Sequence, residues 1–195
     1  FHTAYMKAHY PVEFFAASMT LDMANTEKVN DFRQDAMRLG IKVVAPSVQT
    51  SYRAFEVGEN CIFFSLAAIK GVGEAVVDHI VEVRGDKPFE SIEDFCLRTD
   101  PKFVNRRVWE SLISAGAFDC FGIDRAVLSA GVDRLLAYSQ RAVSDKVSGQ
   151  ADIFGTMSSG PEKVVFPSVP AWLPSEKLMR EFQALGFYLT AHPLD

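Results

Sequence analysis

The chain has 195 residues, of which 48% are hydrophobic and 23% are charged, a composition typical of an ordinary globular protein. This length is enough for one large hydrophobic core or two small ones. The formal net charge of −5 excludes a protein that binds polyanions over its whole surface. Any contact with a nucleic acid would therefore need a local basic patch.

Three cysteines, Cys61, Cys96 and Cys120, are odd in number, far apart and without histidines at metal-ligand spacing. We expect them to be reduced structural residues of a cytoplasmic protein, and we expect no metal site. No segment approaches the ~20 apolar residues of a membrane span and no signal peptide opens the chain, so no membrane contact is expected. The first residue is Phe1 rather than Met, which predicts a piece of a longer protein.

Residues 1–65 are predicted to form helices followed by a small β-hairpin. Pro11 suits the first turn of one helix, and Asn25 is suited to cap the start of the next. Gly40 is placed to end that second helix in a left-handed conformation. Apolar and β-branched runs predict the extended segments, namely 41–45 and then 54–57 and 61–64, the last two joined by a turn.

The stretch Ile69-Lys70-Gly71-Val72-Gly73, which closes the apolar run 66–68, predicts a tight hairpin between one helix and a second helix. Gly71 and Gly73 can adopt positive φ and have no Cβ, so the backbone can approach a partner closely. N–H groups at the start of the following helix have no intrahelical acceptors and lie at the positive end of its dipole. Such a site binds anions, of which phosphate is the commonest. We therefore predict that Lys70, Gly71, Val72 and Gly73 contact DNA backbone without reading sequence.

A plain glycine-rich turn between two packed helices is the alternative interpretation, because short glycine motifs are common. Basic residues outnumber acidic ones between residues 98 and 110. We expect Arg106 and Arg107, within that segment, to support the hairpin in holding DNA.

From residue 66 to residue 140 the pattern predicts further helices. A second helix-loop-helix unit, with a longer and degenerate hairpin, is predicted between Leu112 and Leu128. Two such units favour a tandem domain, and a plain helical bundle remains the alternative. The expected boundaries are a capping box at Ser91 and Asp94, a helix start at Asp100-Pro101, a helix end at Gly116 and a cap at Asp124.

After about residue 140 the helical period is lost, and small, polar, Gly and Pro residues predict a linker over 141–175. Within it, an adjacent aliphatic and aromatic pair stands in a polar tract bounded by glycines. That peptide can either pin the linker to the domain surface or dock into the apolar pockets of a partner. It is formed by Gln150, Ala151, Asp152, Ile153 and Phe154. The last segment predicts a helix over 175–184 and a strand over 186–189.

Several short blocks, taken in order, cover nearly the whole chain. They are Ala4–Pro11, Asn25–Val29, Ala68–Glu74, Asn105–Val108, Ser114–Asp119, Gln150–Gly155 and Gly186–Leu189. Together these blocks resemble the alpha-subunit family of bacterial DNA polymerase III, the C-family replicative polymerases, and their order and coverage make the resemblance specific.

The resemblance implies a mainly α fold with four parts. These are the end of the fingers region (1–65), a tandem helix-hairpin-helix domain (66–140), a linker (141–175) and the lead into an OB-fold (176–195). Gln150 to Phe154 falls where the family has its sliding-clamp-binding motif, with Ile153 where related motifs often have Leu or Met. The implied partners are double-stranded DNA, the sliding clamp (beta subunit) and other holoenzyme subunits.

The whole protein would then be a DNA-directed DNA polymerase, a nucleotidyltransferase that uses Mg²⁺ held by palm carboxylates. In the family that palm lies upstream of Phe1, and this chain has no Asp-x-Asp pair to replace it. We therefore expect no catalytic residue, no cofactor in this chain, and no activity of the chain alone.

Two other classes of protein carry the same hairpin. A repair glycosylase would need a catalytic Asp in a Gly/Pro-Val-Asp turn about twenty residues further on, and the segment Phe89 to Leu97 lacks that turn. A free-standing helix-hairpin-helix DNA-binding module is the remaining alternative.

Overall fold

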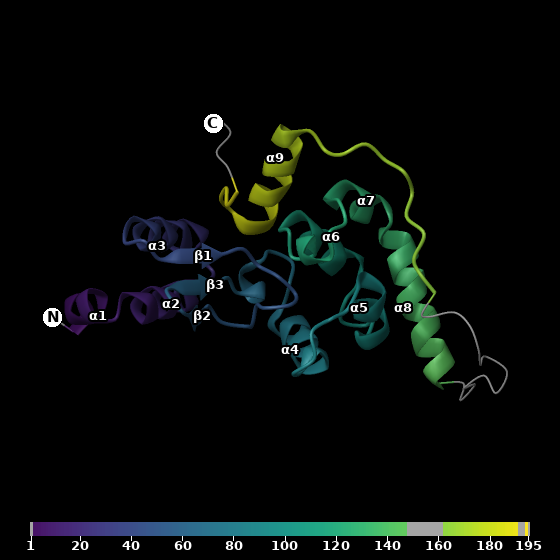
Figure 1. Cartoon of the computed structure of the whole chain (residues 1–195), viewed down its shortest axis with the longest axis horizontal. Helices are drawn as coiled ribbons and strands as arrows, with labels where there is room; N and C mark the ends of the chain where they lie inside the picture. The colour runs from purple at the N-terminus through teal and green to yellow at the C-terminus, as the bar shows by residue number, and fades with distance from the viewer. Residues whose placement is uncertain (1, 148–161, 191–193, 195) are drawn as a thin grey trace.

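A computed structural model describes residues 2–147, 162–190 and 194. The expected mainly α fold is confirmed (Figure 1). The helices are α1 His2–His9, α2 Pro11–Leu21, α3 Thr26–Arg38, α4 Glu74–Arg84, α5 Ile92–Arg98, α6 Arg106–Ser114, α7 Arg125–Ala130, α8 Val132–Val147 and α9 Pro174–Leu185. Two short 3₁₀ helices are η1 Leu66–Ala68 and η2 Asp119–Phe121. The strands are β1 Lys42–Val44, β2 Glu56–Gly58 and β3 Cys61–Phe63.

The strands form one small sheet in the order β1-β3-β2. The expected hairpin is present, with Val57 opposite Ile62 in the antiparallel pair β2 and β3. Strand β1 adds a parallel partner, with Val43 opposite Ile62. Helix α2 contacts β2 and β3, and α3 contacts β1, so the central Ile62 is fully buried. The sheet therefore packs with α2 and α3 in one hydrophobic core.

The caps read from the sequence are confirmed at three helix starts. The side chains of Asn25, Ser91 and Asp124 accept from backbone N–H groups of α3, α5 and α7 at 3.2, 3.1 and 2.8 Å. Each of these bonds satisfies a donor that has no acceptor within its helix. The predicted helix ends are also confirmed, because Gly40 and Gly116 have φ of +76° and +81°.

Two helix starts were predicted wrongly. The segment before the first hairpin is only the 3₁₀ turn η1, because three residues are too few for an α-helix. The helix expected at Asp100 begins at Arg106. Asp100 instead accepts from the N–H of Lys102 at 2.8 Å in a local turn, and Asn105 is the cap of α6.

The helix predicted after Asp124 is divided into α7 and α8 at Gly131. A Cβ on Gly131 would lie 2.6 Å from the Phe166 ring, so the break leaves room for a returning segment of chain. Helix α8 then continues to Val147, beyond the predicted start of the linker at residue 141.

Part of the expected linker runs beside α8 (Figure 1) and is bonded to both α8 and α5. The hydroxyl of Tyr138 donates to the carbonyl of Glu162 at 2.8 Å, and the N–H of Val164 donates to Glu93 at 3.1 Å. Residues 162–166 are therefore attached to the helical domain by hydrogen bonds.

The strand expected at 186–189 does not form. Gly186 ends α9 with φ of +86°, and the N–H groups of Leu189 and Thr190 both donate to the Glu181 carboxylate at 3.2 Å. A side chain of α9 thus satisfies backbone donors that a strand would pair. The lead into an OB-fold remains a prediction.

An aromatic cluster forms the centre of the helical domain. Phe95 of α5, Trp109 of α6 and Phe118 of the following turn lie with ring centroids 4.8–5.3 Å apart. All three are at most 1% exposed. Burying one such side chain contributes about 1.5–3 kcal/mol, so this cluster fixes α6 firmly.

Helix α9 lies between α3 and α6 (Figure 1). Just after it, the buried ring of Phe187 packs against Phe64, with centroids 5.9 Å apart and the ring planes tilted by 50°, and its centroid lies 5.3 Å from the Arg33 guanidinium. This contact joins the end of α9 to both the sheet and α3. In the described part of the chain, no helix has the length and apolarity that crossing a membrane requires.

Candidate nucleic-acid interface

The two glycines of the first hairpin have different roles. Gly71 has φ of +89°, and a Cβ there would lie 2.6 Å from the Ser111 hydroxyl of α6. Gly73 has φ of −77° and ψ of 160°, an extended conformation, and is the N-cap of α4. The expected positive φ is thus used only at Gly71. A Cβ on Gly73 would have no heavy atom within 4 Å, so the N-terminus of α4 is open to an approaching group.

Backbone donors are exposed at this N-terminus. The N–H of Lys70 donates to Ala184 at 2.8 Å, and that of Val72 donates to Ile69 at 3.1 Å. The N–H groups of Gly73, Glu74 and Ala75 have no acceptor among the described residues. They lie at the positive end of the α4 dipole, which is the arrangement that binds phosphate.

Two of the predicted cationic side chains lie beside this hairpin. Lys70 and Arg107 line one cavity of about 360 Å³, and Arg107 Nε lies 3.3 Å from the position of a Cβ on Gly71. Both residues are exposed, and neither side chain forms an ion pair with a described residue. The fold therefore brings Lys70, Gly71 and Arg107 together and leaves both charges available.

Arg106 is placed differently from its neighbour Arg107. Its guanidinium lies 3.5 Å from Glu110 and also pairs with Asp133 of α8. It does not line the cavity beside the hairpin. A contact between Arg106 and DNA remains a prediction. The two ion pairs disfavour it, because they already occupy the guanidinium.

Two other cations, Arg84 and Arg98, are structural and lie at the C-terminal end of α4. Arg84 is 4% exposed and donates to the carbonyls of Val48 and Ser51 at 2.9 and 2.8 Å. Arg98 donates to the carbonyls of Val83 and Arg84 at the end of α4. Their charges satisfy buried backbone acceptors and are not directed at a ligand.

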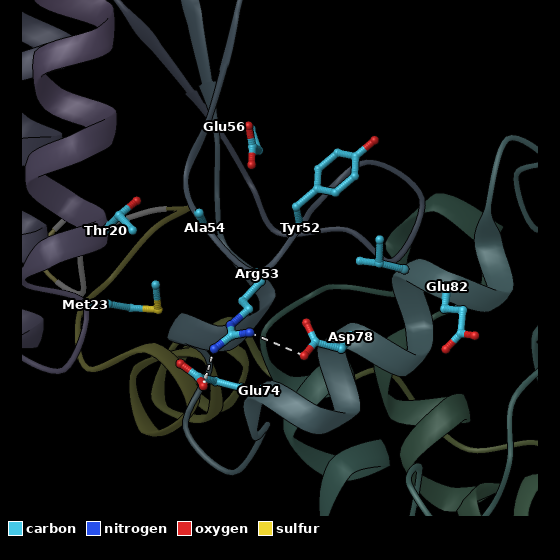
Figure 2. A pocket seen from close by; sticks show the side chains of 10 residues that line it. Thr20, Met23, Tyr52, Arg53, Ala54, Glu56, Glu74, Asp78 and Glu82 are labelled. Atoms are coloured by element: carbon cyan, nitrogen blue, oxygen red, sulfur yellow. Dashed lines mark hydrogen bonds and ion pairs between the residues drawn. The ribbon is translucent and has the colours of Figure 1, made fainter.

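Sequence reasoning missed Arg53, which comes from the loop before β2. Its guanidinium bridges Glu74 at 2.6 Å and Asp78 at 3.4 Å, as Figure 2 shows. These are two of the acidic residues nearest the hairpin, so Arg53 offsets the negative charge beside the α4 N-terminus. Only the pairing of distant segments reveals this contact, and no local sequence signal predicts it.

The pocket in Figure 2 is a separate surface of about 530 Å³ between α2, the 52–56 loop and α4. Glu56 and Glu82 line it in addition to the two carboxylates that Arg53 bridges. This acidic lining is unsuited to a phosphate backbone.

The second hairpin, predicted to be degenerate, is occupied by the protein itself. Arg125 donates to the Asp119 carboxylate through two nitrogens, at 3.0 and 2.7 Å, beside Gly116. The Arg125 side chain is only 7% exposed. This ion pair places a carboxylate in the turn, so the second hairpin is a poor phosphate site and the first one is favoured.

Among the described residues, no three His, Cys, Asp or Glu side chains gather as a metal site would require. The predicted clamp-binding peptide, Gln150 to Phe154, lies outside the described residues.

A family model described as a helix-hairpin-helix motif matches residues 40–128. The whole chain is 43% identical to part of the DNA polymerase III subunit alpha of Caulobacter vibrioides. It is 41% identical to part of the subunit of the same name from Vibrio cholerae and from Escherichia coli K12. In each case the match covers all of this chain and 17% of the relative, so the chain spans about a sixth of the length of these proteins.

The resemblance seen in the sequence is thereby confirmed: from end to end, this chain matches one segment of the DNA polymerase III alpha-subunit family, and that segment contains a helix-hairpin-helix motif.

Proposed function

We propose that this chain is the part of a bacterial replicative DNA polymerase that holds double-stranded DNA by its backbone. The open N-terminus of α4 carries the proposal: three of its N–H groups have no acceptor among the described residues, and Lys70 and Arg107 lie beside the hairpin that leads into it. Similarity along the whole chain to the polymerase subunit supports it over a repair glycosylase or a free-standing module. Binding by backbone amides and cations would be independent of DNA sequence.

The same proposal includes docking on the sliding clamp through Gln150 to Phe154. Gln150 has both a donor and an acceptor for the backbone of a groove, and Ile153 and Phe154 are adjacent apolar anchors. A peptide of this kind binds at about micromolar Kd, about −8 kcal/mol. That affinity suffices because clamp and polymerase share one DNA, which raises their effective concentration toward about millimolar.

The whole protein would act in the cytoplasm as a DNA-directed DNA polymerase, with Mg²⁺ and other holoenzyme subunits. Among the residues of this chain we assign no catalytic group, and we expect a purified preparation to extend no primer with Mg²⁺ or Mn²⁺. Primer-extension assays on successive chromatography fractions test this. Nucleotide incorporation that follows the protein peak would contradict it.

Fluorescence anisotropy with a labelled duplex, titrated at several salt concentrations, tests DNA binding. We expect a Kd of about 10⁻⁴–10⁻⁶ M that is equal for unrelated sequences. Lys70→Ala should weaken all sequences alike and lower the salt slope by about one. Lys102→Ala, outside the hairpin, is the matched control. Binding that does not depend on salt, or that prefers one sequence, would contradict the proposal.

A further inference from the structure

The cavity beside the first hairpin is assembled from four separate elements: the hairpin, α6, α7 and α9. Its lining is dominated by hydrogen-bond donors and cations. They are Lys70, Arg107, Ser111, Ser114, Ser129, Arg180 and Gln183. Glu110 also lines the cavity, and its carboxylate lies 3.5 Å from Arg106, a cation that it shares with Asp133.

Helix α9 is fixed in place before any ligand arrives. Ala184 and Leu185 are buried, and the carbonyl of Ala184 accepts from the N–H of Lys70. The Arg180 guanidinium lies 4.2 Å from the Trp172 ring centroid and 3.0 Å from Glu176. Arg180 is therefore held at the cavity, and little side-chain entropy remains to be lost when an anion binds.

We propose that this cavity binds one phosphate group of the DNA backbone through side chains, and that α9 completes the site. This site rests on the function proposed above, because the hairpin amides would bring the duplex to the cavity. Three cations, of which Arg180 is also paired with Glu176, together with hydroxyl and amide donors are the chemistry that selects phosphate. At about 360 Å³, the cavity has room for a phosphate with its bridging waters, since one water occupies about 30 Å³.

Variants of α9 test the site by salt-titrated anisotropy with the complete chain. Arg180→Gln removes a cation, and Gln183→Glu places a carboxylate in the cavity without changing its size. Each should weaken binding and lower the salt slope by about one, so that raising the salt from 50 to 200 mM reduces the affinity of the variant about threefold less than that of the wild type. Wild-type slopes for both variants would overturn the inference.

Glu176→Gln is the matched control, because it removes the ion pair of Arg180 and leaves the cation. A phosphate site predicts unchanged or tighter DNA binding in this variant. If Glu176→Gln weakened binding as much as Arg180→Gln, Arg180 would act only through its ion pair within α9, and the inference would be wrong.

The fluorescence of Trp172 reports occupancy of the site, with Trp172→Phe identifying its signal against that of the buried Trp109. Duplex DNA should change this signal, and Arg180→Gln should abolish the change. Inorganic pyrophosphate tests a free anion as the source of the phosphate. If pyrophosphate changed the fluorescence and added duplex did not displace it from the site, the assignment to DNA backbone would be wrong.

The hairpin variant Gly73→Val separates this inference from the proposed function. If Gly73→Val weakens DNA binding while the α9 variants do not, the hairpin function stands and the cavity proposal fails. If none of these variants changes affinity, both fail.

Discussion

The backbone N–H of Lys70 donates to the carbonyl of Ala184 at 2.8 Å, joining the first hairpin to the last turn of α9. The backbone of Lys70 is therefore structural, while its side chain remains free to meet a phosphate. Because Ala184 and Leu185 are buried, the hairpin and α9 are fixed by one shared contact.

Substitutions at the two hairpin glycines should have opposite consequences. Gly71→Ala should destabilise the chain by at least ~1 kcal/mol, because φ is +89° and the new Cβ would meet Ser111. Gly73→Ser should leave stability equal or slightly higher, because serine is a good N-cap and the position is open. Urea unfolding of both variants measures this, and equal losses of stability would contradict it.

DNA binding should respond to Gly73 in a way that stability does not. A β-branched side chain in Gly73→Val would cover the free N–H groups of Glu74 and Ala75, so affinity should fall while the fold is retained. Circular dichroism melting beside salt-titrated anisotropy checks the two properties together. Full affinity in a folded Gly73→Val protein would exclude the hairpin amides as the contact.

The buried pair of Arg125 and Glu181 should be important for stability. Their side chains are 7% and 1% exposed, with 3.8 Å between charged atoms. Glu181→Ala also removes the acceptor for Leu189 and Thr190, so the free energy of unfolding should fall by about 3 kcal/mol. The exposed pair of Arg141 and Glu162 is the control. Glu162→Gln should cost less than about 1 kcal/mol.

Cys96 should be inert in the folded chain. Burial raises the pKa of its thiol from 9.0 to about 12, with the bond to Ser139 opposing and Glu93 adding to the effect. Native protein at pH 8 should therefore be alkylated at Cys61 well before Cys96, as peptide mass spectrometry would show. Comparable rates at both cysteines would contradict this.

The raised pKa of Cys96 makes the stability of the chain depend on pH in the alkaline range. Because the folded pKa of Cys96 is raised, its contribution is fully present below about pH 9 and is lost as the pH rises toward about 12. Stability should fall over that window, and Cys96→Ala should reduce the slope. Denaturant unfolding of both proteins at intervals from pH 8 to 11 measures the difference.

Phe154→Ala tests the clamp peptide. Loss of a buried aromatic anchor should cost at least ~2 kcal/mol of clamp affinity. The melting temperature should not change, because we expect this residue to lie outside the helical core. Asp152→Ala is the control that should matter least. Unchanged affinity with a lower melting temperature would show that Phe154 is a packing residue.

Local features of this protein follow directly from its sequence. Asn25, Ser91 and Asp124 cap helices, and Gly40 and Gly116 end them, because capping involves only residues within about one turn. The first hairpin belongs to the same class, since Gly71 is the residue type that its positive φ requires. The predicted helix start at Asp100 was wrong, because two residues in this segment can accept backbone N–H bonds. Asp100 does so in a local turn, and Asn105 does so as the N-cap of α6.

Tertiary structure decided which charges are available to a ligand. Arg84, Arg98, Arg106 and Arg107 look alike in the sequence, and packing directs the first two to carbonyls and the third to carboxylates. Arg107 alone of these four lines the cavity beside Lys70. The contribution of α9 to this cavity depends on the hydrogen bond between the backbones of Lys70 and Ala184. The sequence period of a single helix contains no information about a partner more than a hundred residues away.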